Sequence, residues 1–273
     1  FAGYRLMPSL QQIYAHMTSL KASAPSLDSL ITDLRRLKPY RPVDHQEPEV
    51  GKLLTPTDNI NLINICYRYP GTKNLALKSL NITVPARKRI GIAGSTGSGK
   101  STTVDLILGL LQPSKGVLEV DGTPITSENV REWQRSIGYV PQHIFLSDDS
   151  IAGNIAFGLP VENRDHEAII KAAKIANLHK FIEHELAHGY DTEVGERGVR
   201  LSGGQRQRIG IARALYSSPD VIILDEATSA LDNITETSVM AAIDKLSGEK
   251  TVIMIAHRLS TIKKCDLIYL MKE

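Results

Sequence analysis

Apolar residues repeat at helical spacing through the first 37 residues. Between Tyr4 and Leu20 they recur in alternating steps of four and three, at Leu6, Leu10, Ile13, Met17 and Leu20, the spacing of one helical face. After Ser26, a candidate N-cap, the same kind of spacing returns at Leu27, Leu30, Ile31, Leu34 and Leu37. Because proline ends or kinks a helix, Pro25 is expected to separate two helices. We interpret residues 1–37 as two amphipathic helices, which either pack on the domain that follows or continue a membrane helix.

The composition of the chain changes at residues 38–57. Four prolines, Pro39, Pro42, Pro48 and Pro56, stand there among charged residues and few apolar ones. Such a composition favours extended chain, so we interpret this segment as a linker.

From residue 58 to residue 273, short apolar runs alternate with helical stretches. The runs expected as strands cover residues 60–69, 89–93, 117–120, 137–140, 221–224, 251–255 and 267–270. Helical patterns such as residues 102–111 and 235–246 lie between them. This alternation predicts an α/β domain with a mostly parallel sheet and an antiparallel β part near its start. Residues from about 150 to 214 show helical patterns without a strand-like run, which predicts an inserted helical subdomain.

Composition and charge narrow the class of protein. Of 273 residues, 42% are hydrophobic and the net charge is +2, which excludes disorder as the main state and gives no reason to expect a nucleic-acid partner. Cys66 and Cys265 stand far apart and form no disulfide framework or metal motif. No window holds the roughly 18 to 20 apolar residues of a membrane-spanning helix, so we expect a soluble chain. Because it opens at Phe1, we also expect a fragment of a longer protein.

A glycine-rich segment follows the second expected strand. It consists of Gly94, Ser95, Thr96, Gly97, Ser98, Gly99, Lys100 and Ser101. The segment matches the pattern G-x-x-x-x-G-K-[ST] between a strand and a helix, in which backbone N–H groups and the helix N-terminus bind phosphate. Lys100 would reach the β- and γ-phosphates, and the Ser101 hydroxyl would ligate Mg²⁺. We predict that these residues, with Thr102, bind a nucleotide.

Two carboxylates follow the apolar run at residues 221–224. Asp225 and Glu226 come directly after it, and a run this apolar is typical of a strand buried on both faces. Ligands of open α/β sheets bind at the carboxyl ends of the strands. We expect Asp225 to hold Mg²⁺ and Glu226 to accept a proton from, or orient, the attacking water.

The segment just before this run carries a family resemblance. It consists of Leu201, Ser202, Gly203, Gly204 and Gln205. From about residue 58 onward the chain resembles the nucleotide-binding domain of ABC transporters, whose signature motif is LSGGQ, and this implies a P-loop NTPase core. Small residues at a helix N-terminus let a γ-phosphate approach and form a second anion site.

Further residues match the family's motifs one by one. Tyr69 resembles the aromatic residue on which adenine stacks, although a strand-edge tyrosine is the alternative. Gln142 resembles the Q-loop glutamine, which offers a carbonyl oxygen to Mg²⁺. Residues 229–232 resemble the D-loop, which crosses the dimer interface, and His257 resembles the switch histidine that contacts the γ-phosphate. The resemblance therefore implies ATP and Mg²⁺ as ligands and a catalytic role for His257 beside Glu226.

The resemblance also implies partners and a location. In the family each ATP lies between the phosphate loop of one domain and the LSGGQ motif of another, so we expect a head-to-tail dimer of two copies. Residues 192–198 resemble the segment with which exporters touch their membrane domain. An exporter carries that domain on the same chain, ahead of the ATPase, where residues 1–37 lie. We expect an exporter ATPase at the cytoplasmic face of the inner membrane, and a short similarity at residues 4–10 and 25–28 points to bacterial flippases of lipid-linked oligosaccharides.

Two other classes of protein share parts of the pattern. A soluble ABC ATPase acting on nucleic acid or ribosomes would share the motifs, but its coiled-coil types separate the phosphate loop from LSGGQ by hundreds of residues. Here Gly94 and Leu201 are 107 positions apart, and the balanced charge gives no phosphate-binding stripe. A small-molecule kinase would share the phosphate loop but leaves LSGGQ and His257 unexplained. Nucleotide-driven dimerisation would separate the kinase from both ABC classes.

Overall fold

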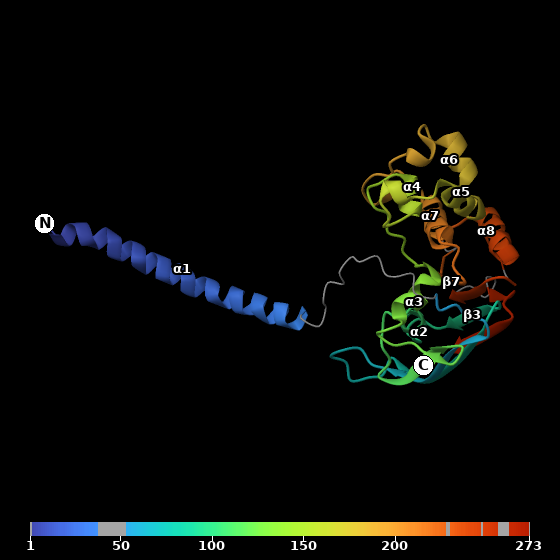
Figure 1. Ribbon diagram of the computed structural model, residues 1–273, viewed down its shortest axis with the longest axis horizontal. Helices are drawn as coiled ribbons and strands as arrows, with labels where there is room; N and C mark the ends of the chain where they lie inside the picture. The colour runs from blue at the N-terminus through green and yellow to red at the C-terminus, as the bar shows by residue number, and fades with distance from the viewer. Residues whose placement is uncertain (1, 38–52, 228–229, 247, 256–261, 273) are drawn as a thin grey trace. The chain divides into compact units, whose positions relative to one another are not determined.

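The computed structural model describes residues 2–37, 53–227, 230–246, 248–255 and 262–272. The chain divides into two compact units, Phe1–Gly51 and Lys52–Glu273, and the second unit contains both sheets (Figure 1). Among the described residues, no helix combines the length and the apolar character that crossing a membrane requires.

The described part of the first unit is one helix, α1, Ala2–Leu37. It continues through Pro8 and Pro25, so the prediction of two helices separated at Pro25 is wrong. Proline removes one N–H donor from a helix interior at a cost of about 3 kcal/mol, but its fixed φ is close to the helical value. Ala22 and Ala24, which lie in the helical turn before Pro25, are strong helix formers and favour continuation of the helix.

The second unit begins with an antiparallel sheet of order β2-β1-β4-β5. Its strands are β1 (Asn59–Tyr67), β2 (Leu77–Pro85), β4 (Lys115–Val120) and β5 (Thr123–Pro124). The antiparallel part near the start of the domain is thereby confirmed. Strand β2 was not predicted as a separate strand, although Leu80, Ile82 and Val84 alternate with polar residues in the way that marks one.

The second sheet is entirely parallel and has the order β6-β7-β8-β3-β9. Its strands are β3 (Arg89–Gly94), β6 (Ile137–Val140), β7 (Val221–Asp225), β8 (Thr251–Ile255) and β9 (Leu267–Met271). Every residue of β7 and β8 is buried, which explains why both read as unbroken apolar runs. Because the strands are parallel, the phosphate loop after β3, Gln142 after β6 and Asp225 at the end of β7 meet at one edge of the sheet.

Helices connect the strands of the parallel sheet. Helix α2 (Lys100–Ile107) follows β3, α3 (Val130–Arg135) precedes β6, and α8 (Asn233–Leu246) lies between β7 and β8. Between β6 and β7 the chain forms α4 (Ile151–Ile155), α5 (His166–Ile175), α6 (His179–Glu185) and α7 (Gly203–Tyr216), with short 3₁₀ turns at Val161–Asn163, Gly189–Asp191 and Glu196–Gly198. This confirms the inserted helical part.

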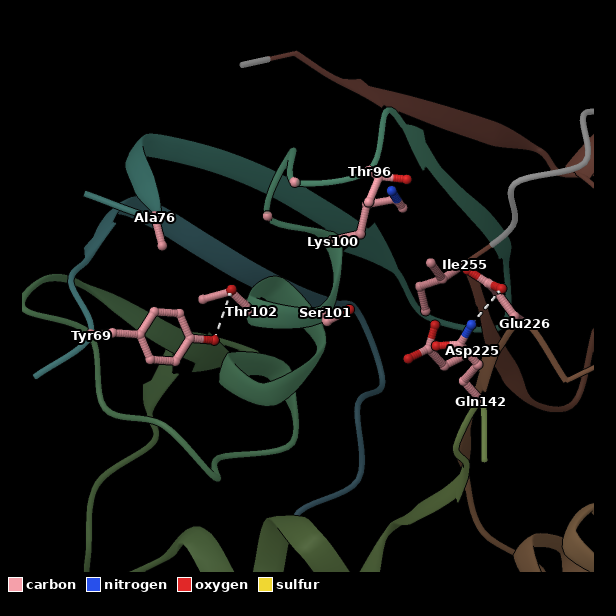
Figure 2. Close-up of a pocket in the computed structure, with 12 residues that line it drawn as sticks. Tyr69, Ala76, Thr96, Lys100, Ser101, Thr102, Gln142, Asp225, Glu226 and Ile255 are labelled. Atoms are coloured by element: carbon pink, nitrogen blue, oxygen red, sulfur yellow. Dashed lines mark hydrogen bonds between the residues drawn. The ribbon is translucent and has the colours of Figure 1, made fainter. Parts of the chain in front are cut away.

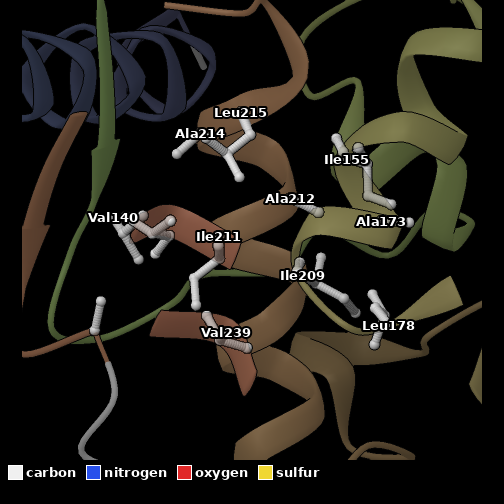
Figure 3. Packing of buried hydrophobic residues seen from close by; sticks show 14 of the residues in the cluster. Val140, Ile155, Ala173, Leu178, Ile209, Ile211, Ala212, Ala214, Leu215 and Val239 are labelled. Atoms are coloured by element: carbon white, nitrogen blue, oxygen red, sulfur yellow. The ribbon is translucent and has the colours of Figure 1, made fainter. Parts of the chain in front are cut away.

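Two hydrophobic clusters lie on opposite faces of the parallel sheet. Ile222 and Leu224 of β7 point into one cluster and Ile223 into the other, as alternation along a strand requires. Helix α7 belongs to the first cluster, where Ile209, Ile211 and Ala212 pack with residues of the sheet and of the helical insertion, such as Val140 and Ile155 (Figure 3). Helix α7 is thus the element that connects the insertion to the sheet.

The Asp121 carboxylate in the turn between β4 and β5 should make the unit sensitive to acid. It accepts hydrogen bonds from the backbone N–H groups of Thr57, Asp58 and Asn59 and from the Thr57 hydroxyl. Partial burial alone would raise the pKa of Asp121, but these bonds outweigh it and hold the pKa below 3.8. Because the folded-state pKa is depressed, this stabilisation is present above pH 3.8 and is lost as the pH falls through the folded pKa. Above pH 3.8 we expect Asp121→Asn to have a lower free energy of unfolding than the wild type. As the pH falls, the stability of the variant should decrease less steeply, and acid unfolding followed by circular dichroism measures both effects.

Candidate functional site

A cavity of about 510 Å³ lies at the carboxyl edge of the parallel sheet (Figure 2). Residues predicted for the site supply most of its lining: Tyr69, Thr96, Gly97, Gly99, Lys100, Ser101, Thr102, Gln142, Asp225 and Glu226. Ala76 and Ile255, which the motifs do not include, complete the lining. The structure therefore brings the phosphate loop, the glutamine after β6 and both carboxylates to one cavity.

The loop before α2 is shaped by glycines and by its own lysine. Gly97 and Gly99 have φ of 88° and 90°, values that side chains with a Cβ rarely adopt. A Cβ on Gly99 would lie 2.6 Å from the Leu77 Cδ2 atom, so β2 also requires glycine there. The Lys100 Nζ atom donates hydrogen bonds to the carbonyls of Gly94 at 2.9 Å and Ser95 at 2.7 Å. The loop is thus folded around a nearly buried ammonium group at its centre.

Three residues predicted for nucleotide binding, Gly94, Ser95 and Ser98, are not part of the cavity lining. Gly94 and Ser95 contribute the carbonyls that accept from Lys100. Ser98 is 6% exposed, and its hydroxyl has no hydrogen-bond partner among the described residues. The carbonyls of Gly94 and Ser95 therefore help to hold the loop in shape around Lys100.

The two carboxylates at the end of β7 differ in environment. Asp225 is 8% exposed and is the last residue of the strand. Glu226 has φ of 50°, the left-handed region, and its N–H group donates to the Ile255 carbonyl at 3.0 Å. The Gln142 Nε2 atom donates to the Glu226 Oε2 atom at 2.9 Å. Because this bond uses the amide nitrogen of Gln142, the carbonyl oxygen of the same side chain remains suited to a cation.

Tyr139 is a neighbour of the site that motif matching missed. It lies on β6, in register with Ile223 of β7, and its hydroxyl is hydrogen-bonded to the Asp225 carboxylate. Burial, as the largest cause, and the nearby Asp225 and Asp105 carboxylates together raise the pKa of Tyr139 to about 12. The neutral phenol is therefore a donor toward Asp225 over the whole physiological pH range. Only the pairing of β6 with β7 reveals this contact.

Tyr69 stands at the side of the cavity with its ring partly exposed, at 38%. Its hydroxyl is 3.0 Å from the Thr102 Oγ1 atom, and its ring packs edge-on against Tyr67 with centroids 5.0 Å apart. These two contacts fix the ring plane beside the start of α2 (Figure 2). A fixed, half-exposed aromatic face is suited to stacking against a planar base.

The residues of the LSGGQ segment lie outside this cavity, at the start of α7. The Ser202 hydroxyl accepts from the Gln205 N–H at 3.2 Å, and the Gln205 side chain accepts from the Ser202 N–H at 2.7 Å, which is a capping box. A Cβ on Gly204 would lie 3.4 Å from the Ala230 carbonyl, so the segment packs closely on the loop that follows β7. The predicted Ser229 and His257 lie outside the described residues.

The residues present fit a nucleoside triphosphate with a divalent cation. A Cβ at Gly97 would meet no atom within 4 Å, so the loop backbone faces open space there. Lys100 supplies a positive charge at the loop. Ser101, Gln142 and Asp225 offer a hydroxyl, an amide carbonyl and a carboxylate around the same cavity, and these hard oxygen ligands are the ones that Mg²⁺ prefers.

Comparison with known proteins agrees with a nucleotide site, because the similar proteins include ATP-dependent and ATP-binding ones. The chain is similar to the ATP-dependent lipid A-core flippase of Pseudomonas aeruginosa, with 44% identity over 210 residues that cover 77% of this chain and 34% of the flippase. It is 38% identical over 278 residues to the heterocyst differentiation ATP-binding protein HepA of a Nostoc strain, which covers 100% of this chain and 44% of the relative. The chain spans less than half the length of these relatives.

A solved structure and a family profile complete the comparison. The structure of a bacterial Atm1-family ABC exporter with ATP bound superimposes with a TM-score of 0.78 and 35% sequence identity, over 89% of this chain and 42% of the exporter chain. The profile of the family described as ABC transporter matches residues 77–229, which includes the phosphate loop, the LSGGQ segment and both carboxylates. The chain therefore belongs to the ABC transporter family.

Proposed function

We propose that this chain is the ATP-binding and ATP-hydrolysing domain of an exporter and that it supplies energy for moving a substrate across a membrane. The observation that carries the proposal is the single cavity that joins the Lys100 loop to Asp225 and Glu226. Membership of the ABC transporter family and the likeness to an exporter with ATP bound support it.

Binding begins at the phosphate loop. The Lys100 ammonium group, which now bonds to two loop carbonyls, would transfer its hydrogen bonds to oxygens of the β- and γ-phosphates. Those oxygens are charged and the carbonyls are not, so the charge-assisted bonds are the stronger ones. The N–H groups at the start of α2 would hold the phosphate chain from the other side.

Hydrolysis needs a base close to the terminal phosphate. Ser101, Gln142 and Asp225 would hold Mg²⁺, which when bound neutralises charge on the phosphate oxygens. The Glu226 carboxylate, oriented by its bond with Gln142, would accept a proton from the attacking water. We include His257 in this chemistry as a contact of the γ-phosphate, on the resemblance alone.

The site as described is half of the proposed unit. Ser202 to Gln205 lie outside the cavity, at an N-terminus whose backbone donors can bind an anion. We propose that they close over ATP held by a second copy of the domain, giving a head-to-tail homodimer with two composite sites. Because ATP is held between the copies, nucleotide binding should favour the dimer by mass action.

The hydrolysis proposal is tested on residues 1–273 with ATP and Mg²⁺. If two copies form each site, phosphate release per mole of chain should rise with protein concentration and then level off. A rate per mole that is independent of concentration, with the chain monomeric in light scattering, would contradict the composite site. Transfer of phosphate to a small molecule instead of water would favour a kinase, and stimulation by DNA or RNA would favour a soluble ABC ATPase.

Coupling to transport is the finer part of the proposal. We infer that the membrane domain lies ahead of the linker on the same polypeptide, with residues 1–37 at its end, and that the ATPase works at the cytoplasmic face of the membrane. Relatives named as lipid A-core flippases support a lipid-like cargo, of which a lipid-linked oligosaccharide is one form. Sequencing the gene upstream of Phe1 tests this: we expect six apolar segments of about 20 residues, and their absence would exclude the exporter.

Replacing Tyr69 should separate recognition of the base from recognition of the phosphates. Tyr69→Ala removes the ring and should weaken ATP binding by roughly 1 to 3 kcal/mol, the range for aromatic stacking on nucleic-acid bases. Tyr69→Phe keeps the ring and loses only the bond to Thr102, so it should bind nearly as the wild type. Calorimetry with ATP and with inorganic triphosphate checks this, since an equal loss for both ligands would show that Tyr69 only supports the fold.

A further inference from the structure

Gln207 on α7 has a buried side-chain amide, and the proposed reaction assigns it no role. Its side chain is 3% exposed. The Nε2 atom donates to the Glu226 carbonyl at 3.2 Å, and the Oε1 atom accepts from the Ala230 N–H at 2.9 Å. Both ends of the amide therefore bond to the segment that follows β7, on either side of Ala227. A buried amide bonded at both ends fixes the groups that it contacts.

Glu226 needs such support because of its backbone conformation. Its φ of 50° lies in the left-handed region, which a residue other than glycine adopts when its surroundings impose it. The N–H of Glu226 is held by the Ile255 carbonyl at the end of β8, at 3.0 Å. The carbonyl of Glu226 is held by Gln207 on α7. The peptide groups on both sides of the Glu226 Cα atom are thus fixed by two different elements.

The side-chain amides of Gln142 and Gln207 contact different parts of Glu226. Gln142 contacts the carboxylate, with its Nε2 atom 2.9 Å from the Glu226 Oε2 atom, whereas Gln207 contacts the backbone carbonyl. Gln142 lines the cavity and Gln207 does not. An effect of Gln207 on the reaction is therefore indirect, through the groups that its amide holds: the Glu226 carbonyl and the Ala230 N–H.

Helix α7 is a firm base for this contact. Ile209, Ile211 and Ala212 are at most 1% exposed and anchor the helix in the core (Figure 3). At its start the capping box holds Ser202, and Gly204 lies against the Ala230 carbonyl. The hydrogen bond from Gln207 therefore connects Glu226 to a helix that is held in place by core packing and by its N-terminal cap.

We propose that Gln207 is a positioning residue for Glu226: its amide holds the peptide after Glu226 so that the carboxylate points into the cavity. The inference deepens the proposed function and rests on it, because it takes Glu226 as the base in ATP hydrolysis. Without the amide, the peptide after Glu226 can rotate out of its left-handed geometry, and the carboxylate spends less time in the reactive position.

Two substitutions at Gln207 separate its two bonds. Gln207→Met keeps the length of the side chain and removes both bonds. Gln207→Glu keeps an acceptor for the Ala230 N–H but removes the donor to the Glu226 carbonyl. Gln134→Met is the matched control, because the Gln134 Nε2 atom also donates to a backbone carbonyl, that of Leu108 at 3.0 Å. Leu108 is the C-cap of α2, at the end of the helix away from the phosphate loop, and neither residue lines the cavity. Each variant is made in residues 1–273.

We expect both Gln207 variants to lower kcat about tenfold while KM for ATP and the Kd of ATP change by less than twofold. Gln134→Met should leave kcat unchanged. In the chain without nucleotide, amide exchange at Ala230, followed by NMR, should speed up in Gln207→Met and stay slow in Gln207→Glu. An equal loss of ATP binding and turnover, or normal kcat in Gln207→Glu, would overturn the positioning role.

A double substitution tests whether Gln207 acts through Glu226. In a Glu226→Gln background the base is already absent, so adding Gln207→Met should lower the residual rate by less than twofold. A further tenfold fall would show that Gln207 supports the fold or the dimer instead, and would overturn the proposal. If the wild-type chain hydrolyses no ATP, the proposed function fails by itself, while exchange at Ala230 still reports whether the Gln207 contact exists.

Discussion

Glu226→Gln is expected to lower ATP hydrolysis by on the order of 100-fold or more while ATP and Mg²⁺ still bind, because the amide keeps the shape of the side chain but cannot accept the proton of the attacking water. Lys100, Ser101 and Asp225 are untouched by this change and line the cavity independently. Phosphate release measured beside calorimetric ATP affinity would show whether binding and turnover separate in this way.

The same variant should accumulate as an ATP-dependent dimer, since uncleaved ATP would keep the two copies together. Light scattering with and without ATP follows the dimer directly. The matched control is Glu226→Gln combined with Ser202→Arg, which places a bulky side chain at the N-cap of α7 and should abolish the dimer. A monomeric single variant at saturating ATP, or a dimer that survives the arginine, would contradict the composite site.

The architecture could be predicted from the sequence wherever one element carried its own pattern. Strand β8 and strand β6 were predicted with their full bounds, because each is an apolar run flanked by polar residues. Boundaries set by turns were less well predicted. Strand β1 ends at Tyr67 rather than at residue 69, because a turn begins at Pro70 and Gly71, and the φ of Gly71 is 78°. The break expected at Pro25 failed because proline disfavours a helix interior without forbidding it.

The candidate site divides in the same way between local and long-range features. The phosphate loop, Gln142 and the two carboxylates each belong to a short motif that can be recognised within a few consecutive residues. The structure brings these three separate motifs around one cavity. The capping role of Gln205 was also readable, because Ser202 and Gln205 have the S-x-x-Q spacing of a capping box. Tyr139 and Gln207 were missed because neither belongs to a motif that names its partner. Tyr139 on β6 contacts Asp225, 86 positions later, and Gln207 on α7 contacts Glu226 after β7, and these elements meet only in the folded domain.

Lys100→Ala is expected to weaken ATP binding by about 10- to 100-fold. Hydrogen bonds to charged groups contribute about 1.5 to 3 kcal/mol, and each 1.4 kcal/mol corresponds to a factor of ten. Lys100 is 6% exposed and lies inside the loop, so no other lysine side chain of the cavity lining can replace its charge among the described residues. Calorimetric titration with ATP in the presence of Mg²⁺ measures the loss.

The control for this loss must remove a positive charge without touching the loop. Lys115 is exposed on β4, in the antiparallel sheet, and does not line the cavity. Lys115→Ala changes the net charge by the same amount, so it should leave the affinity within about twofold, as expected for a distant surface charge screened by salt. Thermal unfolding of Lys100→Ala should show a folded domain, because the two carbonyls that lose their donor can bond to water at the open side of the loop. If the folded variant binds ATP as tightly as Lys115→Ala does, then the loop is not the triphosphate site, and the cavity between β3 and β7 must serve another ligand.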